Sequence, residues 1–346
     1  MSPSLPPAIN GPSAWFGPDM ASRNDWVYPL SPSEIEEIRR AATPWMTQNP
    51  AGITAGAFEL PELAPRLLAI RHEVLQGRGF ALLRGLPVDE WPRELSAAAF
   101  CGLGVHLGHL RAQNARGDLL GHVQDVGLRS DDPNVRLYQT AERQTFHTDS
   151  CDIVGLLCLQ DAKQGGDSAL VSSITMWNVM RERWPHLAHR LLQPVATDRR
   201  GEVPPGAQPF FMIPVFNWYA GHMSAIYQRQ YIDSAQRFDQ APRLDAVWVE
   251  ALDRFDALAN DPALNFHMRL QRGDIQLVHN HTLLHDRTAF VDHPEPERRR
   301  HLLRLWLAPE DARPLPPEFA QRYGSVEPGR RGGVGAAMPQ ASSRMS

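Results

Sequence analysis

The chain has 346 residues, 42% of them hydrophobic and 21% charged, and its formal net charge at pH 7 is −4. These values are typical of a globular protein with a sizeable core, built as one large domain or two small ones. The lack of a basic excess argues against a nucleic-acid partner. Because no apolar run approaches the roughly 18 residues of a membrane span, we expect no membrane partner either.

The cysteines and the first residues bear on the compartment. The three cysteines, Cys101, Cys151 and Cys158, show no CxxC spacing. An odd, sparse set of this kind indicates a reducing compartment without disulfides. The first residues lack the basic and apolar regions of a signal peptide. We therefore expect a cytoplasmic protein.

The two ends differ in composition from the rest of the chain. Residues 1–14 are rich in Pro, Ser and Gly, and residues 329–346 are rich in Gly, Ala and Ser. Both compositions predict disordered segments. With no internal repeat and no long linker between them, we expect a single domain over residues 15–328.

The first third of the chain predicts helices and one buried strand. Ser31 and Glu34 form a capping box, with Pro32 at the first helical position. Further helices are expected over residues 61–75 and 92–103. Between these two helices, the apolar run 79–86 is bounded by glycines and predicts a buried strand.

The remaining two thirds predict mostly strands. Residues 137–172 favour strands, with the clearest at 153–159 and 169–171. A helix follows Ser173 and ends near Pro185, and another has apolar residues at helical spacing from Leu244 to Leu258. Strands return at 265–270, 274–279 and 301–307. This order predicts a mainly β protein with flanking helices (α+β), folded as a jelly-roll barrel buttressed by helices.

One short motif has the residue types of a metal site. His147 and Asp149 stand two apart, so on a strand both side chains point to the same face. An imidazole and a carboxylate are two thirds of the facial triad of non-haem iron(II) oxygenases. The spacing alone is weak, because it occurs by chance in many proteins.

A third ligand would have to come from a distant segment. The stretch 273–285 offers His279, His281 and His285. Strand alternation puts all three on one side, so periodicity does not choose between them. The alternative for each is a core histidine with a satisfied hydrogen bond.

Two arginines interrupt a strongly apolar strand. Arg300 and Arg304 share a face with Leu302 and Trp306, while Leu303, Leu305 and Leu307 lie on the other face. Both faces have the composition of buried surface. A buried guanidinium is costly unless it is paired with an anion, and its planar fork suits a carboxylate. The neighbouring Arg298 and Arg299 are better explained as solvated residues.

Taken together, these motifs resemble the taurine dioxygenase (TauD/TfdA-like) family. The resemblance covers roughly residues 30–310. It depends on four segments in the family's order, with the run 79–86 as a fifth similarity: Phe146-His147-Thr148-Asp149, Gly165-Gly166-Asp167-Ser168, the segment around His285, and Arg300-His301-Leu302-Leu303-Arg304. It implies a double-stranded β-helix of the clavaminate synthase-like or TauD-like kind.

The resemblance also implies roles for single residues. His147, Asp149 and His285 match the three iron ligands, which selects His285 among the three histidines. Arg300 matches the arginine that binds the far carboxylate of 2-oxoglutarate. Arg304 and Ser168 match further co-substrate contacts. One departure is His279, which stands where the family has aspartate.

The function implied is that of an Fe(II)- and 2-oxoglutarate-dependent dioxygenase. Such an enzyme uses O₂ to oxidise a small-molecule substrate, most commonly by hydroxylation, and converts 2-oxoglutarate to succinate and CO₂. Because relatives often associate, a homo-oligomer is also an expectation. Candidate substrate contacts are Tyr138, Gln144 and Asn280.

Other functions are compatible with the same residues. A His-His-Asp site also suits a zinc hydrolase, although a hydrolase has no need of a buried carboxylate clamp. A ligand-binding jelly roll would use His147 and Asp149 structurally. Within the oxygenases, desaturation and ring formation are alternatives to hydroxylation, because the outcome depends on how the substrate is placed.

Overall fold

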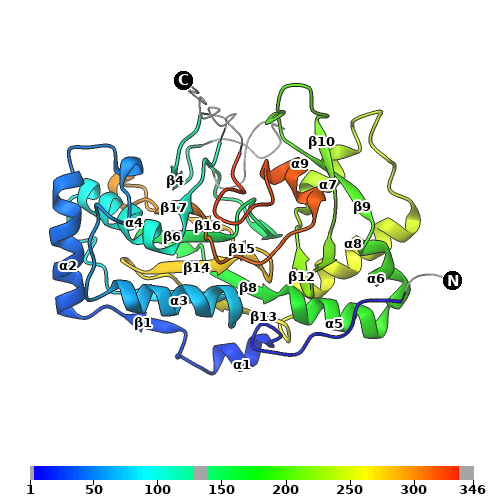
Figure 1. The fold of residues 1–346 in the computed structure, drawn as a ribbon, viewed down its shortest axis with the longest axis horizontal. Helices are drawn as coiled ribbons and strands as arrows, with labels where there is room; N and C mark the ends of the chain where they lie inside the picture. The colour runs from blue at the N-terminus through cyan, green and yellow to red at the C-terminus, as the bar shows by residue number, and fades with distance from the viewer. Residues whose placement is uncertain (1–3, 115, 128–138, 335–346) are drawn as a thin grey trace, which may run out of the picture.

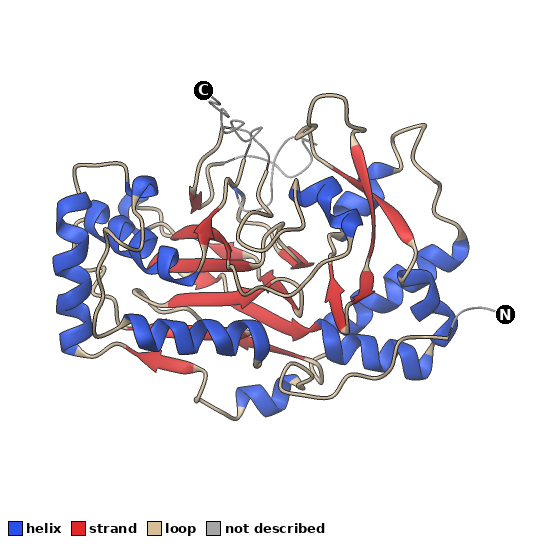
Figure 2. Ribbon diagram, in the orientation of Figure 1, coloured by secondary structure: helices blue, strands red, loops and turns tan. Residues whose placement is uncertain are grey.

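Two β-sheets face each other, and helices cover the outer face of each. The computed structural model describes residues 4–114, 116–127 and 139–334. In Figure 1, α2, α3 and α4 lie on the left of the strands and α5, α6 and α8 on the right. Colouring by secondary structure separates the strands in the middle from these helices (Figure 2).

The larger sheet has seven strands in the order β1-β2-β14-β6-β17-β3, with β4 also paired to β17. The smaller sheet has four strands in the order β13-β8-β15-β5. The strands of the larger sheet are β1 (Val27–Pro29), β2 (Phe80–Arg84), β3 (His109–Leu110), β4 (Leu120–Val123), β6 (Ile153–Gln160), β14 (Ile275–His279) and β17 (His301–Ala308). Those of the smaller sheet are β5 (Gln144–His147), β8 (Ser168–Ser172), β13 (Asn265–Met268) and β15 (Leu283–Arg287).

The remaining elements are helices and short paired strands. The helices are α1 (Gly17–Ala21), α2 (Pro32–Ala42), α3 (Ala64–Gln76), α4 (Arg93–Leu107), α5 (Ser173–Arg183), α6 (Pro185–Leu191), α7 (Arg229–Ala235), α8 (Ala246–Ala259) and α9 (Ala320–Tyr323). Three two-stranded sheets join β7 (Gln164–Gly165) to β16 (Phe290–Val291), β9 (Pro194–Asp198) to β10 (Phe210–Pro214), and β11 (Phe216–Tyr219) to β12 (His222–Ala225).

Strand alternation divides the core into three layers. In β17, Leu303, Leu305 and Leu307 pack with α2, α3 and α4, whereas Leu302 and Trp306 face the space between the sheets. The smaller sheet repeats the pattern, with apolar side chains of β5, β8 and β15 packed outward on α5 and α8. The opposite faces of these strands therefore point into the barrel, where polar side chains must find partners.

Most expected helices and strands are confirmed, with boundaries shifted by a few residues. The capping box is formed, because Glu34 N donates to Ser31 Oγ and Ser31 N donates to Glu34 Oε2. The helix expected over 92–103 continues to Leu107. Gly104 lies inside this helix and does not end it. A Cβ at this position would lie 2.6 Å from Leu305 Cδ1, so the glycine permits close packing of α4 on β17. The jelly-roll architecture and the α+β class are likewise confirmed.

The described part of the N-terminal segment that was expected to be disordered, residues 4–14, is bound to the fold by hydrogen bonds. Residues 4–14 lie along α5, where Ile9 N donates to Asn178 Oδ1 and Asn178 Nδ2 donates to the Ile9 carbonyl. Trp177 Nε1 and Arg181 Nε donate to the carbonyls of Pro7 and Pro6. A proline-rich chain has few backbone donors of its own, and here side chains of the helix supply them.

The expectation for the C-terminal end is also wrong in part. The predicted tail begins at residue 329, yet Arg331 is fully buried and Val334 is 4% exposed. Backbone bonds from Gly333 N to the Ser150 carbonyl and from Val334 N to the Ala112 carbonyl fix this stretch. Glycine content misled the prediction, because these glycines allow close packing. The rest of that tail, residues 335–346, lies outside the described residues.

Two further expectations concern helices and cysteines. None of the described helices has the length and apolarity needed to cross a membrane. Cys101, Cys151 and Cys158 are all buried and free. Burial raises the pKa of the Cys101 and Cys158 thiols to about 12, so these side chains act as small apolar residues.

The contact between the N-terminal segment and α5 yields a stability prediction. Replacing Asn178 with Ala removes both hydrogen bonds to Ile9 and leaves two backbone groups unpaired. We expect the free energy of unfolding to fall by about 1–3 kcal/mol. Denaturant unfolding measures the change, and limited proteolysis should show faster cleavage within residues 4–14. Unchanged stability together with unchanged cleavage would contradict the packing described.

Candidate metal centre

Three side chains from two strands and one turn converge between the sheets. His147 is the last residue of β5, Asp149 follows two residues later, and His285 is in the middle of β15. β15 pairs with β5 in an antiparallel register that sets His285 directly opposite His147. One ligand atom from each of the three residues lies within 4.8 Å of the other two. Ligand atoms around one divalent ion are separated by distances of this order, so the three fit a single metal ion.

The structure also separates the three candidate histidines of the segment 273–285. His281 Nε2 lies 3.0 Å from Asp152 Oδ1, and His279 Nδ1 lies 3.0 Å from Thr282 Oγ1. Neither belongs to the group of converging ligand atoms, which His147, Asp149 and His285 form. The turn at residues 280–282, between β14 and β15, interrupts the strand alternation. That turn is why alternation across the whole segment could not choose a ligand.

Both histidines of the triad are neutral imidazoles. His147 Nδ1 donates to the Thr145 carbonyl, which leaves Nε2 as the acceptor, and Gln144 Nε2 lies 2.8 Å from it. Burial lowers the pKa of His147, and burial is also the main cause that lowers the pKa of His285 to about 3. A neutral imidazole has the free lone pair that a metal requires.

Asp149 is held as an ionised carboxylate. Burial by itself would raise its pKa, but the Arg304 guanidinium and the hydrogen bond from Trp306 favour the ionised form, and the pKa lies below the usual value of 3.8. Trp306 Nε1 donates to Asp149 Oδ2 at 3.0 Å, and Arg304 Nη1 lies 3.6 Å from the same oxygen. These contacts orient the carboxylate, and the same oxygen lies 3.9 Å from His285 Nε2.

On one side of the triad lies a cavity lined by the predicted co-substrate residues. Arg300 is 5% exposed, and its Nη1 is buried without a hydrogen-bond partner among the described residues. Ser168 Oγ exchanges hydrogen bonds with the Gln276 amide. Arg300, Arg304, Ser168 and His285 all line this cavity, as does Arg287, which the sequence did not single out.

The glycines of the Gly165-Gly166-Asp167 motif make room for this arginine. Gly166 has a φ of +75°, and a Cβ on it would lie 3.0 Å from Arg300 Nε. The Phe290 ring lies 5.1 Å from the guanidinium carbon on another side. Burial lowers the pKa of Arg300 to about 10, which still leaves it a cation at neutral pH. The site thus buries a positive charge that has an unpaired donor.

A second cavity lies on the other side of the triad. Its floor is formed by the triad side chains His147 and Asp149 together with Arg304. Its walls come from elements that the sequence did not predict, namely the β9–β10 hairpin, α7 and α9. The wall residues include Thr197, Phe211, Gln228, Tyr231 and Arg322.

The predicted substrate contacts have three different outcomes. Gln144 lines both cavities beside His147. Asn280 is fully buried and lines neither cavity, because its Oδ1 accepts from Asp149 N and its Nδ2 points to Cys151 Sγ. We therefore assign Asn280 a positioning role in place of the substrate contact expected. Tyr138 lies outside the described residues.

Comparisons with known proteins show the family of the chain and agree with its fold. The model of the family described as "Taurine catabolism dioxygenase TauD, TfdA family" matches residues 39–306. The chain is 33% identical over 329 residues to FR-33289 synthase of Streptomyces rubellomurinus, covering 91% of this chain and 95% of that one. It is 29% identical over 326 residues to the taurine hydroxylase-like protein SAT17 of Stachybotrys chartarum, covering 90% of this chain and 83% of that one.

A solved structure of asparagine oxygenase in complex with Fe(II), 2S,3S-3-hydroxyasparagine and succinate shares the fold. Its TM-score is 0.65 at 19% sequence identity, covering 82% of this chain and 93% of that one. The family match spans well over half of the chain. The chain therefore belongs to the TauD, TfdA family, and it is an iron(II)- and 2-oxoglutarate-dependent dioxygenase.

Burial of His285 makes the stability of the metal-free protein depend on pH. Its pKa is about 3 in the folded chain against 6.5 in model peptides. Between these values the unfolded chain binds the additional proton, so the free energy of unfolding falls as pH decreases, by up to about 1.4 kcal/mol per pH unit. The variant His285→Gln should flatten this dependence between pH 6.5 and 4, as measured by denaturant unfolding. The exposed His267→Gln is the control, and equal slopes in the His285 variant and the wild type would contradict the assignment.

Proposed function

We propose that this protein hydroxylates a small polar substrate, with His147, Asp149 and His285 as the iron ligands. The observation that carries the proposal is the position of the triad between two cavities. One cavity contains a buried arginine with an unpaired donor, and the other is lined by polar side chains beside His147 and Asp149. A hydroxylase of this class must hold two different molecules against one metal, and two cavities that meet at the triad suit this need.

The charge and the hydrogen-bond donors of the residues that line the Arg300 cavity fit 2-oxoglutarate. The keto-acid end of the co-substrate would approach the metal beside His285. The far carboxylate would then meet Arg300, with the Ser168 hydroxyl as a second donor. A carboxylate there compensates a buried guanidinium that otherwise has an unsatisfied Nη1. Arg304 is less available, because its Nε donates to Gln113 Oε1 at 2.7 Å and its Nη1 faces Asp149.

The second cavity, lined by Gln228 and Arg322, fits the primary substrate. Gln228 is 9% exposed and its Oε1 is buried without a hydrogen-bond partner among the described residues. Arg322 faces the same cavity, with its Nε on Ser150 Oγ and its two Nη atoms 3.4 Å from Glu202. Polar groups of this kind favour a substrate with its own hydrogen-bonding groups over a purely apolar one.

When bound, iron(II) with 2-oxoglutarate and O₂ supplies oxidation of a substrate C–H bond, coupled to formation of succinate and CO₂. The protein provides position and exclusion of water. The neutral imidazoles and the ionised Asp149 supply the ligand atoms. Arg300 fixes the register of the co-substrate, and Gln144 lies beside His147 where the two cavities meet.

The zinc-hydrolase alternative accounts for less of the site. A hydrolase explains the three ligands but leaves the Arg300 cavity without a role. A purely ligand-binding jelly roll predicts neither stoichiometric iron nor succinate. Both are distinguished from the proposal by measuring succinate formed from 2-oxoglutarate in the presence of Fe(II).

The ligand assignment predicts the effect of removing the carboxylate. Replacing Asp149 with Ala leaves two imidazoles, so we expect iron binding to weaken strongly and succinate formation to become undetectable. The control is Asp161→Ala, which removes a half-exposed carboxylate paired with Arg269 and outside the site. Succinate release by chromatography is the measurement. Turnover retained in the Asp149 variant would defeat the ligand assignment.

The co-substrate assignment predicts a separate effect. Replacing Arg300 with Met keeps the volume but removes the buried cation, so we expect 2-oxoglutarate to bind about 10- to 100-fold more weakly, as for loss of a charged hydrogen bond. Fe(II) affinity should change little. Anaerobic titration of the visible charge-transfer band measures the affinity. The control is Arg298→Met, at an exposed arginine two residues earlier; equal affinities in both variants would contradict the role of Arg300.

A further inference from the structure

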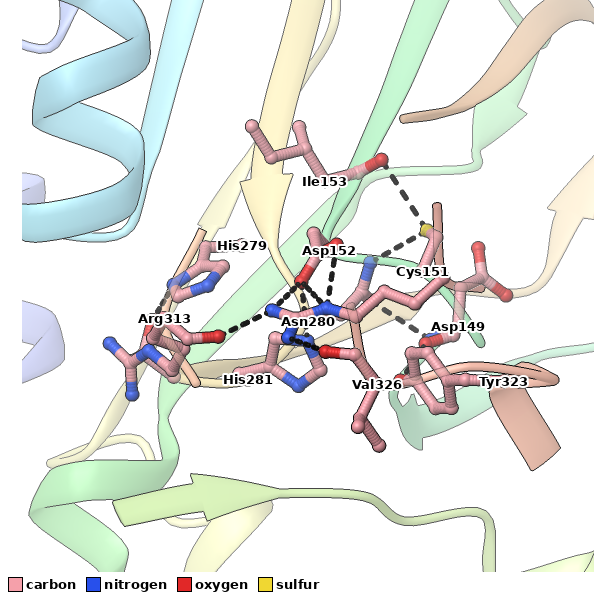
Figure 3. Close-up of polar contacts among 12 residues, drawn as sticks. Asp149, Cys151, Asp152, Ile153, His279, Asn280, His281, Arg313, Tyr323 and Val326 are labelled. Atoms are coloured by element: carbon pink, nitrogen blue, oxygen red, sulfur yellow. Dashed lines mark hydrogen bonds and ion pairs between the residues drawn. The ribbon is translucent and has the colours of Figure 1, made fainter. Parts of the chain in front are cut away.

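The turn that carries Asp149 is anchored by a buried network behind the metal centre. Residues 148–152 connect β5 to β6, so Asp149 itself is on neither strand. Figure 3 shows Asp149, Cys151 and Asp152 on this turn, facing Asn280 and His281. A ligand on a turn depends on side-chain and backbone contacts for its position, because no sheet ladder fixes it.

Asp152 is the centre of the network. It is fully buried, as are its two partners His281 and Arg331. Arg331 Nη2 donates to Asp152 Oδ1 at 2.7 Å, Arg331 Nε lies 3.1 and 3.2 Å from the two carboxylate oxygens, and His281 Nε2 lies 3.0 Å from Oδ1. These contacts hold the pKa of Asp152 below its usual value despite burial, which alone would raise it.

Arg331 is satisfied on every nitrogen. Besides the carboxylate, its Nη1 donates to the Val326 carbonyl and its Nη2 to the Arg313 carbonyl. This use of the whole planar fork is specific to arginine, because a lysine ammonium cannot reach the same set of acceptors. The guanidinium therefore ties the segment 313–331 to the turn at one point.

Further contacts connect the same turn to its surroundings, one residue after another. Asn280 N donates to the Asp152 carbonyl, and Asn280 Oδ1 accepts from Asp149 N at 2.9 Å. Gly333 N donates to the Ser150 carbonyl at 2.7 Å, and Arg322 Nε donates to Ser150 Oγ at 2.7 Å. The C-terminal segment thus forms direct hydrogen bonds with the turn at Ser150 and Asp152.

We infer that Arg331 is a positioning residue, through which the C-terminal segment 313–334 holds Asp149 in place to bind the metal. The inference rests on the proposed function only in taking Asp149 as a ligand. The segment lies beyond residues 39–306 that match the family model. It therefore adds a support to this chain that the matched region does not contain.

A purely structural role for Arg331 makes a different prediction. Removing one partner of a buried ion pair is destabilising wherever the pair lies. A suitable comparison is Arg84, whose Nε and Nη2 grip the fully buried Asp274 just before β14. Arg331 acts near the other end of β14, where Asn280 follows the strand. Both variants should lose stability, but only the Arg331 variant should disturb the metal centre.

The experiment compares Arg331→Met, Arg331→Lys and Arg84→Met in the full chain. Co²⁺ binding to the metal-free protein is followed by visible absorption, and amide hydrogen exchange of a peptide covering residues 148–153 is measured without metal, both well below the unfolding temperature. We expect Arg331→Met to bind Co²⁺ about 10-fold or more weakly, as for other residues that orient metal ligands, and to exchange faster in that peptide. Arg84→Met should match the wild type in both.

In Co²⁺ affinity and in amide exchange, Arg331→Lys should fall between the wild type and Arg331→Met, because lysine keeps the positive charge but lacks the planar set of donors of the guanidinium. If Arg331→Met does not fold, Arg331→Lys decides by the same two readouts. Wild-type Co²⁺ affinity and wild-type exchange in the Arg331 variants would overturn the inference. A wild-type protein that binds no Co²⁺ would instead overturn the proposed metal ligands, while the exchange comparison would still decide the role of Arg331.

Discussion

The site depends on the antiparallel pairing of β15 with β5, which sets His285 opposite His147. The two strands are separated by more than 130 residues in the sequence, so only the sheet brings the two imidazoles together. A slip of one residue would turn one histidine to the outer face, where Phe146 and Leu284 pack against helices. The apolar residues that alternate with the two histidines therefore enforce the register that the metal centre requires.

Charge at the centre follows from the same geometry. Asp149 is a largely buried anion. Arg304 and Trp306, on the inner face of β17, contact its carboxylate. The two histidines stay neutral because burial opposes their protonation. Arg300, one residue before β17, brings a second cation to the inner face, with an unpaired donor. Bound 2-oxoglutarate would supply a negative charge that compensates Arg300, and a bound metal ion would supply a positive charge that compensates Asp149.

Much of the fold and part of the site could be predicted from the sequence. Strand periodicity predicted that His147 points with Asp149 and Arg300 with Arg304. Each pair does share a site, although Asp149 lies on the turn after β5 and Arg300 one residue before β17. Trp306 was placed on that same face, but its bond to Asp149 was not foreseen. The choice of His285 came from resemblance, since the turn at 280–282 breaks the alternation. The β9–β10 and β11–β12 hairpins were missed, because short strands in isolated pairs leave a weak periodic signal.

The supports of the site were the least predictable part. Asp152 and Arg331 are 179 residues apart, and neither belongs to a motif. Glycine-rich composition suggested a loose tail from residue 329, whereas the buried guanidinium of Arg331 needs a fixed partner. The composition of the N-terminal segment was a poor guide for the same reason, since side chains of α5 form hydrogen bonds with its backbone groups. Composition describes what a segment does alone, whereas residues 4–14 and 329–334 are held by contacts with the rest of the chain.

The most direct test of the central claim is a crystal structure grown without oxygen in the presence of Fe(II) and 2-oxoglutarate, with anomalous data at the iron edge. We predict one iron peak within bonding distance of His147 Nε2, an Asp149 carboxylate oxygen and a His285 ring nitrogen, with the far carboxylate of 2-oxoglutarate on Arg300. Iron bound elsewhere, or a co-substrate that leaves Arg300 unpaired, would contradict the account.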